Sequence, residues 1–120
     1  MKKILIAEDD VFLQKVFEAK MKKVGYDIRI ATDGEEVASI LAEFTPDLIV
    51  LDLILPKKNG FEILKELKGS SKWKNIPVIV TTNLSQPEDK ERVKALGASE
   101  YIVKSDTPIA VMIEKIQALL

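Results

Sequence analysis

Five short apolar runs alternate with five stretches of helical periodicity, and this alternation constrains the fold more than any other feature. The predicted strands are residues 3–7, 26–31, 48–51, 76–81 and 100–103. The third run is apolar throughout and lies between a proline and a turn signal, which is typical of a strand buried on both faces of a parallel sheet. We therefore predict an α/β fold with one five-stranded parallel sheet, strand order 2-1-3-4-5, and helices on both faces.

The predicted helices have recognisable sequence signals at their ends. Asp9 or Asp10 can cap the first helix, and Val24 with Gly25 marks its end. The other predicted helix starts pair a capping residue with an acid or a proline: Thr32 with Glu35, Ser85 with Glu88, and Asp106 or Thr107 with Pro108. We find no internal repeat and no linker, so residues 1–120 are predicted to form one domain.

Composition excludes several classes of chemistry. The chain has no Cys and no His, so thiol nucleophiles, thiolate metal sites and imidazole bases or ligands are excluded. The 18 basic and 19 acidic residues are interspersed, which argues against direct binding of nucleic acid. No apolar run approaches the ~20 residues of a membrane span, so we expect a cytoplasmic protein without membrane contact. Carboxylate, hydroxyl and lysine chemistry remain.

Polar residues follow four of the predicted strands at the edge where ligands collect in open α/β sheets. They are Glu8 and Asp9, Asp52, Thr82, and Lys104. The first and third strands are neighbours in the predicted order, so their three carboxylates should converge. Close carboxylates repel, and one takes a proton unless a cation is present.

A hard divalent cation resolves this repulsion, because Mg²⁺ prefers oxygen ligands and binds through one or two carboxylates together with phosphate oxygens. An acidic cluster with Mg²⁺, a lysine and a hydroxyl is suited to handling a phosphoryl group. Asp52 is the central member and the best candidate nucleophile, since carboxylates form acyl phosphates. Taken singly, each residue also has a plainer interpretation, which for Asp52 is a turn cap.

Several motifs resemble the receiver domain of two-component response regulators, the CheY-like family, over the whole length of the chain. They are residues 4–10, residues 46–52 with Pro56 and Gly60, residues 77–82, and residues 97–104. The resemblance implies that Asp52 accepts a phosphoryl group from a phosphohistidine and that Mg²⁺ is the cofactor. It also implies that Glu8, Asp9 and the main-chain carbonyl of Ile54 hold the metal together with Asp52.

The same resemblance implies a conformational switch. Thr82 and Lys104 would contact the phosphoryl oxygens, and Tyr101 matches an aromatic residue that turns inward when Thr82 moves. Such a pair is a bistable element biased by a local change of charge. For Tyr101, a half-buried aromatic on an edge strand remains the alternative.

Two residues depart from the family's usual pattern. Ser105 stands where the family usually has a proline joined by a cis peptide bond, so we predict a trans bond between Lys104 and Ser105, because a cis bond before a non-proline residue costs about 2.5–4 kcal/mol. Asn83 stands where a small residue is usual. It either narrows the path to Asp52 or supplies a hydrogen-bond donor.

Ile54 and Leu84 occupy positions whose side chains overhang the site in the family. Neither can orient or deprotonate a water molecule, which hydrolysis of an acyl phosphate requires. We therefore expect a long-lived phosphorylated state. Other features have two interpretations: Lys57 and Lys58 are a phosphate clamp or a solvated turn, and Val11 with Phe12 is a kinase-docking pair or ordinary packing.

The favoured function is a single-domain phosphoacceptor with no output domain, rather than an enzyme. Its expected partners are a sensor histidine kinase or phosphotransfer protein, and a downstream protein that binds the face of the fourth helix, fifth strand and fifth helix. We expect a monomer that can dimerise on phosphorylation. An aspartyl-phosphate phosphatase is disfavoured because Ile54 replaces the acid such enzymes place two residues after the nucleophile. A degenerate receiver that binds proteins without phosphorylation is the remaining alternative.

Overall fold

Five parallel strands form one sheet in the order β2-β1-β3-β4-β5 in the computed structural model, which describes residues 1–120. Their bounds are β1 (Lys3–Ala7), β2 (Asp27–Ala31), β3 (Leu48–Asp52), β4 (Val78–Thr82) and β5 (Glu100–Val103). The predicted fold class and strand order are therefore confirmed. β4 begins two residues later than predicted, because Pro77 has no N–H to donate to the ladder.

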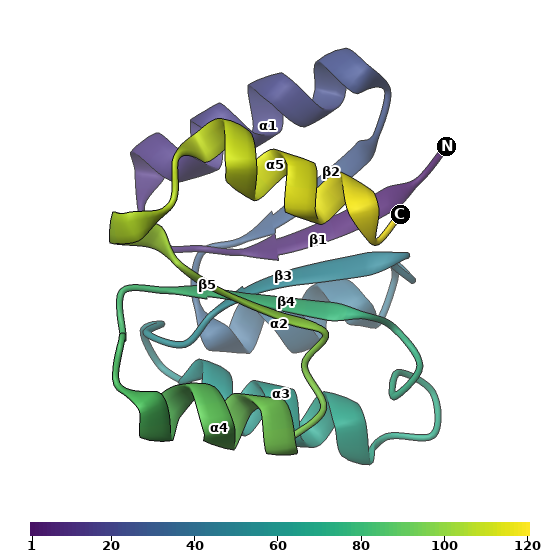
Figure 1. Ribbon diagram of the computed structural model, residues 1–120. Helices are drawn as coiled ribbons and strands as arrows, with labels where there is room; N and C mark the ends of the chain where they lie inside the picture. The colour runs from purple at the N-terminus through teal and green to yellow at the C-terminus, as the bar shows by residue number, and fades with distance from the viewer.

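Helices cover both faces of this sheet, as Figure 1 shows: α1 and α5 lie on one face, and α2, α3 and α4 on the other. Their bounds are α1 (Val11–Val24), α2 (Gly34–Leu41), α3 (Gly60–Gly69), α4 (Pro87–Ala95) and α5 (Ile109–Ala118), with a short 3-10 helix at Lys104–Asp106. None of the helices combines the length and the apolar composition needed to cross a membrane.

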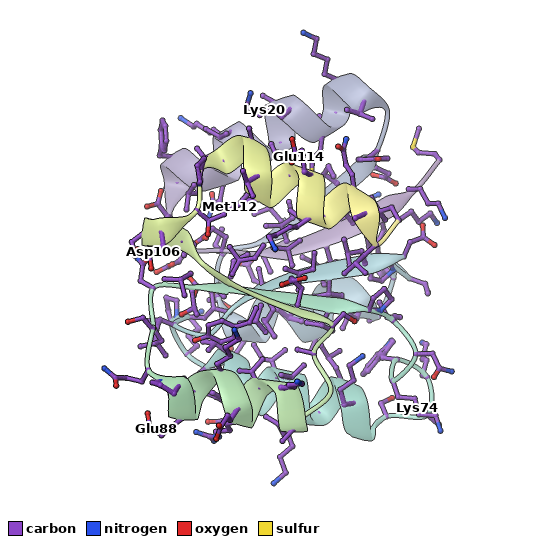
Figure 2. All side chains as sticks on the ribbon, in the orientation of Figure 1. Lys20, Lys74, Glu88, Asp106, Met112 and Glu114 are labelled. Carbon is purple, nitrogen blue, oxygen red and sulfur yellow. The ribbon has the colours of Figure 1, made fainter.

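The sheet separates two apolar cores. The larger, of 16 buried residues, lies under α2, α3 and α4, and the smaller, of 11, lies under α1 and α5. Met112, labelled in Figure 2, lies on the side of α5 that faces the sheet and belongs to the smaller core. All five residues of β3 are buried, and it is the middle strand of the sheet, so the strand that ends in Asp52 lies at the centre of the molecule.

One helix start agrees with its sequence signal, and another differs from it by one residue. The Asp10 carboxylate accepts the main-chain N–H of Leu13 and caps α1, as predicted. The predicted capping box of Thr32 with Glu35 is wrong, because Asp33 caps α2 by accepting the N–H of Glu36 at 2.9 Å. The Thr32 hydroxyl instead bonds the Glu36 carboxylate. An aspartate is as good a cap as a threonine, and the local backbone selects the later residue.

The last two predicted helix caps are also wrong. Gln86 rather than Ser85 precedes α4, and no side chain caps it, since Pro87 occupies the first turn. Pro108 precedes α5, again without a side-chain cap. In the first turn of a helix, proline presets the backbone angle and removes an N–H that would otherwise need a partner, so α4 needs no capping oxygen.

Gly60, which begins α3, allows the helix to lie directly against the strand that carries Asp52. A Cβ atom at this position would overlap the Asp52 carbonyl oxygen and lie 2.6 Å from the Leu53 Cα. We expect Gly60→Ala to lower the free energy of unfolding by about 1–3 kcal/mol, the usual cost of overpacking. Urea unfolding checks this.

Gly69→Ala is the matched control for this prediction. Gly69 ends the same helix, and a Cβ atom there would have no heavy atom within 4 Å. Because alanine favours a helix more than glycine does, the control should be neutral or slightly stabilising. Equal unfolding midpoints for the two variants would show that the close approach at Gly60 has no energetic consequence.

Candidate functional site

Three acids meet at the carboxyl ends of the two central strands. Glu8 and Asp9 directly follow β1, and Asp52 ends the adjacent β3. One carboxylate oxygen of each lies within 4.8 Å of the others. Glu8 and Asp52 are only 1% and 3% exposed, whereas Asp9 is exposed. The structure thus brings together the acidic cluster predicted from the sequence.

Lys104 connects the two buried acids from the end of β5. Its Nζ donates to Glu8 Oε1 and to Asp52 Oδ2, both at 2.8 Å. The other oxygen of each acid accepts a main-chain N–H: Asp52 Oδ1 from Ile54 at 3.1 Å, and Glu8 Oε2 from Asp10 at 3.2 Å. Each buried carboxylate is therefore held at both oxygens, which fixes its orientation.

Burial and charge act against each other in this ion-pair network. Burial raises the pKa of the Glu8 carboxyl, and the hydrogen bond from Lys104 only partly opposes it. Burial alone would lower the pKa of Lys104, but hydrogen bonds to Asp52 and Glu8 outweigh it and raise that pKa above its usual value. Lys104 therefore stays cationic, while Glu8 takes a proton more readily than an ordinary glutamate.

A cavity of about 290 Å³ opens above the cluster. Its lining residues are Glu8, Asp9, Asp10, Asp52, Ile54, Asn83 and Lys104. The donor set fits a hard cation, because it consists of carboxylate oxygens and Asp9 has no ion-pair partner in the protein. The cavity is also large enough for a phosphoryl group beside a hydrated ion.

Thr82 does not line this cavity. The residue is fully buried, and its hydroxyl accepts the main-chain N–H of Leu84 at 3.2 Å. The Tyr101 hydroxyl donates to the carbonyl oxygen of the same residue at 2.6 Å. The main chain of Leu84 therefore connects the two predicted switch residues, a link that the sequence does not reveal.

Asn83 and Ser105 join the two loops at the mouth of the cavity. The peptide bond between Lys104 and Ser105 is trans, as predicted, because the chain has no cis peptide bond. The main-chain N–H of Ser105 donates to Asn83 Oδ1 at 3.1 Å. A proline at position 105 would have no such N–H, so the two departures from the family pattern are physically linked.

The remaining predicted positions have varied surroundings. Ile54 is 57% exposed and lines the cavity, whereas Leu84 packs against the larger core instead of lining it. Val11 and Phe12 are exposed beside the acidic cluster. Lys57 pairs with Asp33 and Lys58 with Glu66, so neither lysine reaches the cavity, and the interpretation as a solvated turn is supported.

Sequence reasoning missed two contributors to the site. Gly60 was recognised as part of a turn and of a family motif, but not for its structural role, which is that its lack of a side chain permits the close approach to Asp52. Gln14 donates from Nε2 to the carbonyl oxygen of Glu8 and so anchors the start of the acidic segment. Gln14, seven residues after Ala7, belongs to no sequence motif. Only the turns of helix α1 bring its side chain back to Glu8.

Comparison with known proteins finds many chains that are similar in sequence. The family model described as the response regulator receiver domain matches residues 4–117. A probable transcriptional regulator, ycf27, from Porphyridium aerugineum is 39% identical over 88% of this chain and 43% of its own length. The DNA-binding dual master transcriptional regulator RpaA from Synechocystis is 34% identical over 100% of this chain and 49% of its own length. The chain thus spans about half the length of these relatives.

Solved structures share the whole fold. The chemotaxis response regulator CheY4 of Vibrio cholerae superposes with a TM-score of 0.90 at 28% identity, covering 100% of this chain and 99% of that one. The Mn²⁺-bound response regulator Rcp1 gives a TM-score of 0.84 at 29% identity, covering 99% of this chain and 91% of that one. The similarity therefore extends over the sheet and the helices.

Proposed function

The chain belongs to the response regulator receiver domain family, and from this premise we propose that Asp52 accepts a phosphoryl group from a sensor histidine kinase or phosphotransfer protein. One observation carries the proposal. The Asp52 carboxylate, on the central strand, lies between the Lys104 ammonium and two further acids at the floor of an open cavity. A carboxylate so placed lines the cavity that a donor would enter, and its hydrogen bonds hold it oriented for attack.

The proposed transfer forms one bond and breaks one. An Asp52 carboxylate oxygen attacks the phosphorus, and the bond from phosphorus to the donor's nitrogen or oxygen breaks, so that the leaving group departs with the electron pair. Lys104, already 2.8 Å from Asp52 Oδ2, stabilises negative charge on the phosphoryl oxygens. The phosphoryl group stays on Asp52 after the dephosphorylated donor has left, so the protein is proposed to be a phosphoacceptor rather than a turnover enzyme.

Receiver domains bind a divalent metal in an acidic pocket, and we propose that the ion here is Mg²⁺. Asp9 and Asp52 would hold it directly, with Glu8 and the Ile54 carbonyl as the other proposed ligands. When bound, Mg²⁺ would neutralise charge between the acids and the phosphoryl oxygens. Glu8 and Asp52 must then share their oxygens between Lys104 and the ion, so Lys104 competes for the same site.

The proposed switch uses the main chain of Leu84. If the Thr82 hydroxyl turns toward a phosphoryl group, it breaks the hydrogen bond that it now accepts from the Leu84 N–H. The Leu84 carbonyl, which accepts the Tyr101 hydroxyl, belongs to the same loop and moves with it. Movement at Asp52 would thereby reach Tyr101, which also lines a groove of about 210 Å³ between α4 and β5. That groove supports the proposed downstream binding face of α4, β5 and α5.

Incubation with Mg²⁺ and a small acyl phosphate tests the proposal. Intact mass should show one added phosphoryl group, and omission of Mg²⁺ with a chelator present should suppress it. A degenerate receiver would remain unmodified under both conditions. If the wild-type protein forms no adduct, phosphoacceptance is rejected. The alternative function, a phosphorylation-independent binding module, is then favoured.

The phosphorylated state is predicted to be long-lived, because the exposed Ile54 side chain at the cavity cannot activate water. Ile54→Asn should accelerate loss of the phosphoryl group by roughly tenfold, less than the ~10²-fold or more of a well-positioned general base. Following intact mass after removal of the donor measures the decay. Val11→Asn, at another exposed apolar position beside the site, is the control, and equal decay of the two variants would contradict the idea.

We further propose that this domain signals through contact with a protein partner. One of the relatives, RpaA, is a DNA-binding transcriptional regulator. For the residues of this domain we propose protein partners, because basic and acidic residues are interspersed.

A further inference from the structure

The end of β4 presents Asn83, rather than Thr82, to the cavity above Asp52. Thr82 is fully buried and its hydroxyl is engaged with Leu84, whereas Asn83 is one of the lining residues. Before any movement of Thr82, the side chain of residue 83 is therefore the polar side chain of this strand end that lines the cavity.

The orientation of the Asn83 carboxamide follows from its partner. The main-chain N–H of Ser105 can only donate, so the atom 3.1 Å from it must be the carboxamide oxygen. Nδ2 is consequently on the other side of the carboxamide, and its two N–H groups have no hydrogen-bond partner in the protein. A main-chain donor thus fixes which end of the side chain is free.

Donors are scarce in this cavity. Four of its lining residues are acids, Glu8, Asp9, Asp10 and Asp52, and one is the apolar Ile54. The Ile54 N–H is already donated to Asp52. Among lining side chains, only Lys104 and Asn83 carry N–H groups, while a phosphoryl group brings three oxygens that need donors.

We propose that Asn83 Nδ2 donates a hydrogen bond to an oxygen of the phosphoryl group on Asp52, with the Ser105 main-chain N–H holding the side chain in this orientation. The inference rests on the proposed phosphoacceptor function and adds a phosphoryl ligand to it. Asn83 and Lys104 then both contact the phosphoryl group, each from a different loop, those that follow β4 and β5.

Three variants separate this role from simple obstruction of the cavity. Asn83→Ala removes the donor and opens the cavity. Asn83→Asp keeps an oxygen for the Ser105 N–H but replaces the donor with negative charge. Asn75→Ala makes the same substitution at an exposed asparagine that does not line the cavity, so it is the matched control and should behave like the wild type.

The measurements are the rate of adduct formation with Mg²⁺ and acetyl phosphate, by intact mass, and the side-chain amide signals of Asn83 in ¹⁵N-labelled protein. Asn83→Ala should take up the phosphoryl group about tenfold more slowly, less than the ~10²-fold of a buried oxyanion donor because Asn83 is exposed. Asn83→Asp should be slower still. The Asn83 amide signals of the wild type should shift on phosphorylation.

Other outcomes overturn the inference in distinguishable ways. Uptake by Asn83→Ala at or above the wild-type rate, or Asn83 amide signals that do not move, would reject the donor role while leaving phosphoacceptance intact. Failure of the wild type itself to form an adduct would reject the proposed function, and the role of Asn83 with it.

Discussion

Asp52→Asn is expected to abolish the phosphoryl adduct that the wild-type protein forms. The asparagine carboxamide has no carboxylate oxygen able to attack phosphorus, and Asp52 is the acid of the cavity that ends the fully buried strand β3. The effect is therefore all or none, and intact mass after incubation with Mg²⁺ and an acyl phosphate measures it.

The folded state should survive this substitution. Asparagine keeps an oxygen that can accept a hydrogen bond from the Lys104 ammonium. The substitution also removes one negative charge from a cluster of three acids. Circular dichroism and the unfolding midpoint provide the check. Asp106→Asn is the matched control, because Asp106, labelled in Figure 2, lies in the 3-10 helix beside the site but does not line the cavity. A full adduct on Asp52→Asn would show that a residue other than Asp52 accepts the phosphoryl group.

Lys104→Met is expected to produce the largest loss of stability, about 3–5 kcal/mol in the free energy of unfolding. That is the usual cost of breaking a buried ion pair by removing one partner. Lys104 is 10% exposed at its side chain, and it is the cation bonded to both Glu8 and Asp52. Methionine preserves much of the stem's volume, so the effect reports charge rather than packing. Lys115→Met, which breaks an exposed pair with Glu100, should cost under about 1 kcal/mol.

The loss of stability in Lys104→Met should depend on pH and on divalent ions. Burial already raises the pKa of Glu8 above its ordinary value of 4.5, and removal of Lys104 raises it further. A folded state that binds more protons loses stability as pH rises through this window, so the variant should be weakest near neutral pH and recover toward pH 4.5. Urea unfolding at several pH values measures this.

Mg²⁺ should partly restore the variant, by about 2.7 kcal/mol at a concentration 100 times its dissociation constant. In the wild type, the raised pKa of Lys104 means that its contribution is present while its carboxylate partners are ionised and disappears at high pH only as pH rises above 10.5 through the folded-state pKa. A Lys104→Met variant no less stable than Lys115→Met would contradict the importance of the buried network.

Several expectations from the sequence succeeded because they depend on periodicity alone. A run such as Leu48–Leu51 is recognisable without knowing its neighbours, and parallel strands must deliver their carboxyl ends to one edge. Glu8, Asp9 and Asp52 therefore converge in the structure as predicted. The helix caps were less predictable, since Asp33 displaces Thr32 by a single residue and such a shift depends on backbone angles that no motif specifies.

The amino-acid sequence by itself determined the strand order, the acidic edge and the trans bond before Ser105, because each follows from hydrophobic pattern, residue chemistry or the cost of a cis peptide. The tertiary structure alone decided how the site is held. It pairs Lys104 with Glu8 as well as Asp52, turns the Thr82 hydroxyl toward Leu84, and joins Asn83 to Ser105. These contacts connect residues from different loops, and their geometry depends on how the loops pack after the sheet has formed.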